Sequence, residues 1–263
     1  MPTERKPRTR KSTAPGSSDA VADSTSGDGL GRVGVEGEIS ESESPTESSL
    51  VPDPLVAPAI VEPTILLMYS GGLDSLGALH TLLTDCQYFR QGLHVHHIHI
   101  HNQEGRNEAE AQAVKQTLDY FRQPAFRPFS YSESEMSFPT FGKNFMWDTD
   151  AVGFTAASIC LACPSITKVA LGLTKTDFGM RVPPGLFERL ERRDHLLALF
   201  GSMGKIFYPQ GDLTKQEIYA GLPPDVRDFA WSCRTPVKQG DSFKACGLCR
   251  SCLHGIPNTT KKL

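Results

Sequence analysis

The stretch Thr64-Ile-Leu-Leu-Met-Tyr-Ser-Gly-Gly-Leu-Asp-Ser75 decides the fold that we expect of this chain. Its first half is a short apolar run typical of a buried strand, and the segment Leu76–Leu83 that follows is typical of a helix. Glycines let backbone N–H groups approach an anion closely, and the start of a helix adds unpaired donors and a partial positive charge. Strand, glycine turn and helix in this order predict a phosphate-binding loop at residues 70–75.

The loop lacks the GxxxxGK[ST] pattern of the common P-loop, so we do not expect a kinase-like or GTPase-like site. It resembles the SGGxDS loop of the pyrophosphatase-type ATP enzymes, the PP-loop superfamily, which split ATP between the α and β phosphates. A plain glycine turn is the alternative interpretation. The resemblance implies that Ser70, Asp74 and Ser75 are catalytic, with Asp74 orienting the loop or holding Mg²⁺. The residues implied in ATP binding are Tyr69, Ser70, Gly71, Gly72, Leu73, Asp74 and Ser75.

Four cysteines near the other end of the chain form a C-x12-C-x2-C-x2-C pattern: Cys233, Cys246, Cys249 and Cys252. Such spacing suits tetrahedral zinc, because two-residue loops turn consecutive thiolates onto one cation. All four positions around the ion are then filled by the protein, which predicts a structural zinc site rather than a catalytic one. An iron–sulfur cluster, which also takes four cysteines, and a redox dithiol are the alternatives.

Three segments between these features match one known family in the same order: Asn102-Gln-Glu-Gly-Arg-Asn-Glu-Ala-Glu110, Val169-Ala-Leu-Gly-Leu-Thr-Lys-Thr-Asp-Phe178 and Tyr208-Pro-Gln-Gly-Asp-Leu-Thr-Lys-Gln-Glu-Ile218. Together with the glycine loop and the four cysteines, these segments resemble the 7-cyano-7-deazaguanine synthase (QueC) family over about residues 64–256. The resemblance implies an adenine-nucleotide alpha hydrolase-like α/β fold. This fold has three layers, with a parallel sheet between helices, and a small C-terminal zinc-binding module follows it.

The family resemblance also implies an activity, that of an ATP-dependent carbon–nitrogen ligase. Such an enzyme converts 7-carboxy-7-deazaguanine and ammonia to the nitrile through adenylated intermediates, releasing pyrophosphate and AMP. The implied cofactors are ATP, Mg²⁺ and Zn²⁺, and the implied assembly is a homodimer. Thr176, Asp177 and Phe178 are the candidate substrate contacts, because an aspartate accepts hydrogen bonds from a guanine-like edge and a phenyl ring stacks on a base. A solvated Asp177 in a surface loop is the alternative. Lys175 and Arg181 are candidates to balance the substrate carboxylate.

The chain departs from the family at residues 144–150, where Asn-Phe-Met-Trp-Asp-Thr-Asp stands in place of a Pro-x-Arg-Asn stretch. Without this arginine, the stretch lacks a planar guanidinium group, which is always charged and suited to binding an anion. Two further hypotheses therefore stay open. One is a diverged relative of bacterial anti-phage defence, which adenylates a deazaguanine or ligates it to another substrate such as a protein. The other is a nucleotide-binding partner protein without turnover.

The composition limits the classes of partner. A net charge of −3 and a pI near 6.2 provide no global basic field for duplex nucleic acid. No apolar run is long enough to span a bilayer, and the start lacks the apolar core of a signal peptide. The seven cysteines, four of them in a metal pattern, favour reduced thiols over a secreted disulfide framework. We expect a cytoplasmic protein that acts on a small molecule.

Residues 1–60 differ in kind from the rest, because Ser, Thr, Pro, Gly and Glu dominate and large apolar residues are scarce. Such a segment buries too little surface to offset its ordering entropy, which predicts a disordered tail. Its basic start, residues 5–11, and its acidic part, residues 36–47, make a protein partner for the tail the alternative to a solvated segment. The expected domains are the tail (1–60), an ATP-binding α/β domain (61–225) and a zinc-binding module (226–263).

Strands and helices are expected to alternate along the folded part. The predicted strands lie near 64–69, 93–101, 166–173 and 205–208, and the predicted helices near 74–84, 107–122, 151–163, 185–201 and 214–221. The stretch between residues 123 and 150 is expected to be irregular, and Thr214 with Glu217 reads as a capping box. This alternation predicts a parallel sheet with helices on both faces and ligands at the carboxyl ends of its strands.

Two further patterns invite a metal or sulfur hypothesis. The strand at 93–101 carries five histidines, but the two-residue period places His94 and His96 on one face and His97, His99 and His101 on the other, which argues against a joint metal site. One or two of them are expected to line the nucleotide pocket. The pair Cys160-Leu-Ala-Cys163 lies in an apolar setting that predicts core packing. Sulfur or cluster chemistry, as in PP-loop enzymes that thiolate transfer RNA, is the alternative, and it calls for a basic surface.

Overall fold

The structure is a computed structural model that describes residues 62–138, 147–177, 185–199 and 205–254. The predicted tail, residues 1–60, lies outside this part of the chain. The residues from Leu55 to Leu263 form one compact unit. No helix within the described ranges is both long and apolar enough to cross a membrane.

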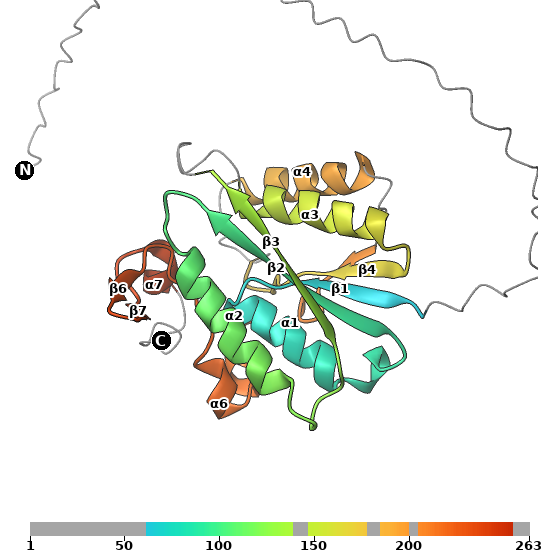
Figure 1. The fold of residues 1–263 in the computed structure, drawn as a ribbon, viewed down its shortest axis with the longest axis horizontal. Coiled ribbons are helices and arrows are strands. Elements are labelled where there is room, and N and C mark those ends of the chain that lie inside the picture. Colours follow the sequence, from blue (N-terminus) through green and yellow to red (C-terminus); the bar gives the residue numbers. More distant parts are fainter. Residues whose placement is uncertain (1–61, 139–146, 178–184, 200–204, 255–263) are drawn as a thin grey trace, which may run out of the picture. The chain divides into compact units, whose positions relative to one another are not determined.

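A five-stranded parallel sheet with the order β3-β2-β1-β4-β5 forms the centre of this unit (Figure 1). Its strands are β1 (Thr64–Met68), β2 (Gly92–His101), β3 (Ser130–Ser137), β4 (Ile166–Ala170) and β5 (Lys205–Phe207). β1 is central, and the side chains from Ile65 to Met68 are buried on both of its faces, as expected of a parallel sheet covered on two sides.

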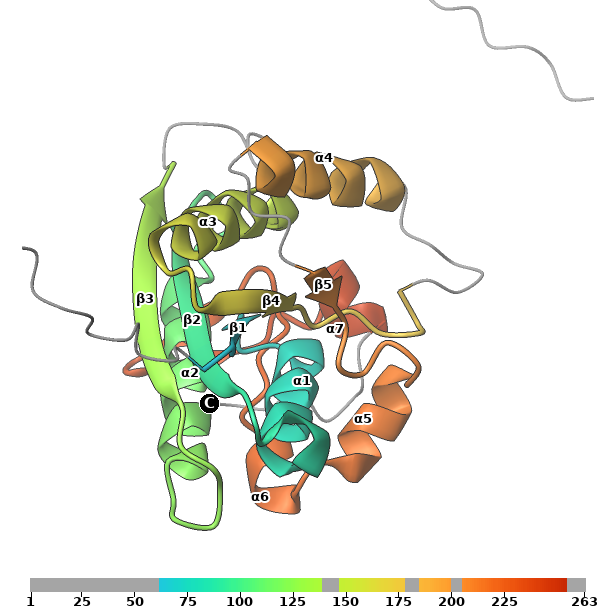
Figure 2. The same cartoon turned by 90° about the vertical axis from the view of Figure 1, so that its right-hand side faces the viewer.

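Helices cover both faces of the sheet, which confirms the predicted three-layer α/β class (Figure 2). On one face, α1 (Leu73–Thr84) and α2 (Asn107–Phe121) pack against Ile65 and Leu67 of β1. On the other face, α3 (Asp148–Ala162) and α4 (Leu186–Leu199) pack against Leu66 and Met68. The alternating side chains of one strand therefore supply both halves of the core.

The remaining elements follow the sheet strands or close the C-terminal part. They are a 3-10 turn (Cys86–Tyr88), α5 (Lys215–Gly221), α6 (Pro224–Arg227), β6 (Val237–Gln239), β7 (Ser242–Lys244) and α7 (Arg250–His254). The predicted capping box at the start of α5 is confirmed, since Thr214 Oγ1 accepts from the Glu217 N–H and the Thr214 N–H donates to Glu217 Oε2. The antiparallel hairpin β6–β7 and the short helices α6 and α7 were not predicted, because segments of three to five residues show no usable period.

The expectation of irregular chain between residues 123 and 150 is wrong at Ser130–Ser137, which forms the edge strand β3. Serine and glutamate are weak strand formers, so the composition hid the strand. Pairing with β2 supplies the stability that propensity lacks. The imidazole nitrogens of His94 and His96 lie 2.7–3.0 Å from serine hydroxyls of β3, namely those of Ser130, Ser132 and Ser134.

The predicted division of the β2 histidines between two faces is confirmed. His94 and His96 face the serines, whereas His99 Nε2 lies 3.0 Å from Glu133 Oε2 and His101 Nε2 lies 3.1 Å from Glu135 Oε1 on the opposite face. The five rings therefore do not converge on one point: four of them contact side chains of the edge strand β3, and His97 contacts the Tyr69 carbonyl instead.

Cys160 and Cys163 lie at the C-terminal end of α3, just before β4 begins. Cys160 packs against the core between the sheet and α3, as predicted, whereas Cys163 is exposed and does not share that role. The helix ends at Ala162, which leaves Cys163 in the turn to β4 and outside the apolar face. Because β4 is parallel to β1, this pair lies at the amino edge of the sheet, opposite the glycine loop.

Gly172 provides a test of how tightly the strand ends pack. A Cβ atom at this position would lie 2.5 Å from the Ser75 backbone nitrogen and 2.7 Å from the Asp74 carbonyl carbon. We expect Gly172→Ala to lower the free energy of unfolding by about 1–3 kcal/mol, measured by urea denaturation, because backbone atoms have to shift. Gly221→Ala is the matched control, since nothing lies within 4 Å of a Cβ there. Wild-type stability of Gly172→Ala would contradict this close approach.

Candidate functional site

The glycine loop follows β1 and leads into α1, so it lies at the carboxyl edge of the sheet. The strand order reverses between β1 and β4, and open α/β sheets bind ligands in the crevice outside such a reversal point. The segment after β4 reaches the same place, because Gly172 lies against the backbone of Ser75. The fold therefore places the loop at 70–75 where a ligand is expected.

The loop is braced by the hydroxyls of its two serines. Ser70 Oγ and Ser75 Oγ lie 3.1 Å apart, and Ser75 Oγ donates to the Gly72 carbonyl at 3.0 Å. The N–H of Ser70 donates to Ser75 Oγ at 3.3 Å. Gly71 has a φ of 76°, a conformation that favours glycine. Two hydroxyls thus gather at the start of a helix, and phosphate binding at this loop stays a prediction.

Tyr69 and Leu73, which flank the serine–glycine run, have their side chains in the hydrophobic core. The Tyr69 carbonyl lies 2.8 Å from Nδ1 of buried His97. Burial lowers the pKa of His97 to about 4, so this ring is neutral at physiological pH. Tyr69 and Leu73, two of the predicted nucleotide contacts, therefore do not offer their side chains, and the Tyr69 N–H already donates to the His96 carbonyl at 2.7 Å.

A lysine that sequence reasoning did not select joins two predicted site residues. Lys215 Nζ lies 2.5 Å from Asp74 Oδ2 and 3.4 Å from Asp177 Oδ1. Lys215 occupies the first turn of α5, next to its Thr214 cap. A cation in the first turn of a helix opposes the helix dipole, and this local conflict is the signal that could have found it.

The charges of this cluster depend on one another. Burial raises the pKa of Asp74, and the ammonium of Lys215 opposes that effect. Burial would lower the pKa of Lys215, but the carboxylates of Asp74 and Asp177 outweigh it and the pKa is raised. Lys215 is thus held as a cation beside the loop. Asp74 Oδ1 is buried and has no hydrogen-bond partner among the described residues, so this oxygen remains for a cation.

The predicted substrate contacts lie beside the same lysine. Asp177 Oδ2 accepts from both the N–H and the hydroxyl of Thr174, at 3.0 and 2.9 Å, while its other oxygen faces Lys215. Thr176 Oγ1 accepts from the Lys215 N–H at 3.3 Å, and Lys175 is exposed. Phe178 and Arg181 lie outside the described residues. A base that bonds to Asp177 would therefore compete with Thr174 and Lys215.

The four cysteines of the C-terminal pattern converge, with their sulfur atoms all within 4.8 Å of one another. Cys246 Sγ and Cys249 Sγ lie 3.9 and 3.4 Å from Cys252 Sγ. Four sulfurs at about 2.3 Å from one tetrahedral zinc ion are about 3.8 Å apart. The cysteines of a four-iron cluster lie further apart, since the cluster itself stands between them. The residues present fit a single tetrahedral ion.

Hydrogen bonds to sulfur support the thiolate form that a metal requires. The Thr235 hydroxyl donates to Cys246 Sγ at 3.1 Å and lowers the pKa of Cys246 to about 6. The backbone N–H of Cys249 also donates to Cys246 Sγ, at 3.2 Å, and the N–H of Arg234 donates to Cys249 Sγ at 3.5 Å. These donors orient the thiolates as the outer shell of a metal site does.

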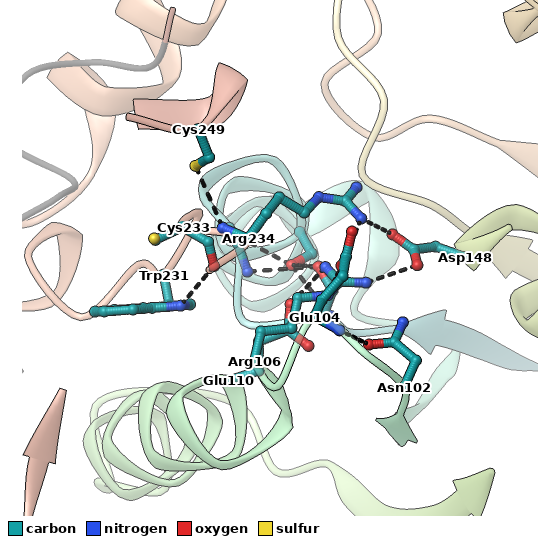
Figure 3. A network of polar contacts seen from close by, with 12 residues as sticks. Asn102, Glu104, Arg106, Glu110, Asp148, Trp231, Cys233, Arg234 and Cys249 are labelled. Atoms are coloured by element: carbon teal, nitrogen blue, oxygen red, sulfur yellow. Dashed lines mark hydrogen bonds and ion pairs between the residues drawn. The ribbon is translucent and has the colours of Figure 1, made fainter. Parts of the chain in front are cut away.

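A buried charge network joins this cysteine site to the start of α2 and α3 (Figure 3). The Arg106 guanidinium contacts Glu104 at 2.8 Å, Glu110 at 2.8 Å and Asp148 at 2.6 Å. Arg234 Nη1 contacts Asp148 at 2.9 Å and Glu104 at 3.3 Å. Two arginines thus face three carboxylates, which leaves one negative charge in excess. Asp148 belongs to the stretch where the sequence lacks the expected arginine.

Burial raises the pKa of Glu110 to about 7, although Arg106 opposes the shift. The native state then holds a proton that the unfolded state, with an ordinary pKa of 4.5, releases. Stability conferred by this proton is present at low pH and is lost as pH rises from about 4.5 through 7.

Glu110→Gln tests this titration, because glutamine does not ionise. We expect the free energy of unfolding of the variant, relative to wild type, to rise by on the order of 2–3 kcal/mol between pH 5 and 8. Chemical denaturation at a series of pH values provides the measurement. Glu108→Gln is the control on the same helix, where the side chain is exposed and pairs with Lys238. Parallel pH curves for wild type and Glu110→Gln would contradict the raised pKa.

Cys246→Ser tests whether the cysteine cluster holds a metal that stabilises the fold. We expect bound metal and thermal stability to fall together, by about 2–5 kcal/mol in the free energy of unfolding, because three thiolates remain buried beside the core. Metal analysis and thermal denaturation provide the readouts. Cys86→Ser, at an exposed cysteine outside the cluster, is the control. Full stability without metal would contradict the structural role.

Comparisons with known proteins do not identify the function of this chain. No family model matches the sequence, and no curated protein matches it. Among solved structures, the U34-tRNA thiolase NcsA from Methanococcus maripaludis, with its 4Fe-4S cluster, is similar at 14% sequence identity and a TM-score of 0.41. The similarity covers 60% of this chain and 56% of that chain, little more than half its length. What this chain does is therefore inferred from its own loop, charged residues and cysteines.

Proposed function

We propose that this chain is an ATP-using enzyme of the PP-loop type, which adenylates a carboxylate or amide and releases pyrophosphate. One observation carries the proposal: Ser70 and Ser75 converge at a helix start, at the strand-order reversal, beside the Lys215 cation. N–H groups, hydroxyls and an ammonium at one point match the charge and donor needs of a pyrophosphate.

The residues beside the loop supply what adenylation requires. Lys215 balances phosphate charge, and the buried, unpartnered Asp74 Oδ1 is a suitable oxygen ligand for Mg²⁺. The magnesium ion would neutralise charge that develops on the phosphates. No protein nucleophile is needed, because positioning and electrostatic stabilisation lower the barrier when the substrate itself attacks the α phosphate.

As the specific reaction we propose conversion of 7-carboxy-7-deazaguanine and ammonia to the nitrile. The substrate carboxylate attacks the α phosphate of ATP, pyrophosphate leaves, and ammonia opens the mixed anhydride to an amide with release of AMP. The amide oxygen attacks the α phosphate of a second ATP, a second pyrophosphate leaves, and loss of AMP and a proton forms the nitrile. Support comes from the resemblance of the loop, the cysteine pattern and the segments that position Asp177 and Lys215.

For the cysteine site we propose a structural zinc ion held by Cys233, Cys246, Cys249 and Cys252. The sulfur separations favour one tetrahedral ion over a four-iron cluster. Bound zinc would hold the four sulfur atoms together through four metal–sulfur bonds. It would have no open coordination position for substrate, so the reaction takes place at the loop.

A second candidate function is adenylation of a different carboxylate or amide, including one on a protein. Asp148 favours it, because this carboxylate pairs with Arg106 and Arg234 in the stretch where the family has an arginine. The family's arginine, whose guanidinium group is suited to binding an anion, is then absent from that stretch. Sulfur transfer has less support, since Cys160 and Cys163 lie at the opposite edge of the sheet from the loop.

The first experiment incubates zinc-analysed protein with Mg²⁺-ATP, ammonium and 7-carboxy-7-deazaguanine, and follows AMP and base products by mass spectrometry. A nitrile product with stoichiometric AMP is expected. AMP without nitrile, seen when other carboxylates are supplied, would favour the second candidate. ATP binding without AMP under all conditions would overturn the proposal of an enzyme and leave a nucleotide-binding partner protein.

Lys215→Met tests the charged group beside the loop. We expect AMP formation to fall by about 10²–10³-fold, because an ammonium that faces the developing phosphate charge is lost. Lys115→Met is the matched control, since Lys115 is exposed on α2 and pairs only with Asp119 among the described residues. Circular dichroism establishes that both variants are folded. A Lys215→Met enzyme with the wild-type rate would remove Lys215 from the site.

A further inference from the structure

Trp231 contacts both the glycine loop and the cysteine site. Its backbone N–H donates to the Gly71 carbonyl at 2.9 Å. Its indole Nε1–H donates to the Cys233 carbonyl at 3.0 Å. The side chain is only 2% exposed, so neither hydrogen bond is readily exchanged for one to water. One buried residue thus holds the main chain of a loop glycine and that of a cysteine ligand.

The glycine loop has little room to move independently of Trp231. A Cβ on Gly71 would lie 3.1 Å from Val114 Cγ2 and 3.3 Å from the Glu110 carbonyl oxygen, both on α2. A Cβ on Gly72 would lie 3.6 Å from the Trp231 carbonyl oxygen. Helix α2 therefore packs against one side of the loop and Trp231 against the other.

Helix α2 is also connected to the cysteine site (Figure 3). Arg234, next to Cys233, donates its N–H to Cys249 Sγ and pairs through its guanidinium with Asp148 and Glu104. Those two carboxylates hold Arg106, which in turn pairs with Glu110 on α2. Both groups that pack against the loop, α2 and Trp231, are thus connected to a cysteine of the four-cysteine site.

The apolar contacts between α2 and the cysteine site follow the same arrangement. A single small core joins the first turns of α2 to the cysteine segment, and Cys246, Cys249 and Cys252 pack against it. Its buried members are Ala109, Ala113, Trp231, Cys233, Phe243 and Ala245. A change in the arrangement of the cysteines therefore displaces groups that touch the loop, because packed interiors transmit small shifts.

We infer that Trp231 is a positioning residue that couples occupancy of the four-cysteine site to nucleotide binding at the loop. The inference rests on the proposed function, since it takes ATP as the ligand of the loop and zinc as the ion. With zinc bound, Cys233 and Trp231 are fixed and the loop is held ready for phosphate. Without it, no ion holds the four sulfur atoms together and the Cys233 carbonyl loses its fixed orientation. Coupling is reciprocal, so bound nucleotide strengthens zinc binding by the same factor.

Trp231→Phe tests this coupling, because phenylalanine fills most of the buried space but cannot donate to Cys233. We expect the zinc-loaded variant to keep its zinc and its fold while the Kd for a non-hydrolysable ATP analogue with Mg²⁺ rises about 2- to 10-fold, the loss of one buried hydrogen bond. Isothermal titration calorimetry measures the Kd. Trp147→Phe is the control at the other tryptophan, which is 41% exposed and lies under Arg189.

A second measurement needs no variant. Zinc release from wild-type protein to a chromogenic chelator is followed with and without the ATP analogue, and slower release with nucleotide is expected. Unchanged release, together with an unchanged Kd in Trp231→Phe, would overturn the coupling while nucleotide binding stands. No binding of the analogue to zinc-loaded wild type would overturn the proposed function as well. The two failures are therefore distinguishable.

Discussion

The close packing around the glycine loop is the constraint on which the rest of this structure depends. Three segments far apart in the sequence press against it: α2 against Gly71, the turn after β4 against Ser75, and Trp231 against both glycines. The approach of Gly172 to Ser75 leaves no room for a Cβ atom, that of α2 to Gly71 is tight, and that of Trp231 to Gly71 is closed by a backbone hydrogen bond. The loop is therefore shaped by its surroundings as much as by its own sequence, which is what preorganised binding of an anion requires.

Buried charge is distributed so that each group near the loop has a partner. Lys215 lies between two carboxylates on one side, and Arg106 lies among three on the other. Removing one member of such a cluster leaves an uncompensated buried charge, which is far less favourable than the complete set. The Lys215 ammonium lies beside the glycine loop, where its charge is shared between Asp74 and Asp177. The ion pairs of Arg106 and Arg234 connect α2, α3 and the cysteine segment to one another.

Sequence reasoning succeeded where the signal was local. The buried run of β1, the glycine turn and α1 are contiguous, and the cysteine spacing is set by short loops, so both features are visible in a single stretch. It failed at β3, whose Ser and Glu residues form a strand only because His94 and His96 lie beside them. It also passed over Lys215: the conflict of this lysine with the dipole of α5 is a local signal, but only the tertiary structure shows that Asp74 lies 2.5 Å away.

The sequence by itself determined the strand, turn and helix around the glycine loop, most of the alternating strands and helices, and the set of four cysteines, because these follow from periodicity, glycine placement and spacing. Only the tertiary structure decided what surrounds the loop: the Lys215 cation, the Arg106 network and the tie through Trp231 to Cys233. These contacts join residues up to 160 positions apart in the sequence, as Gly71 and Trp231 are. Such pairs meet because the tertiary fold brings segments that follow different strands and helices to the carboxyl edge of the sheet, a relation that no local pattern contains.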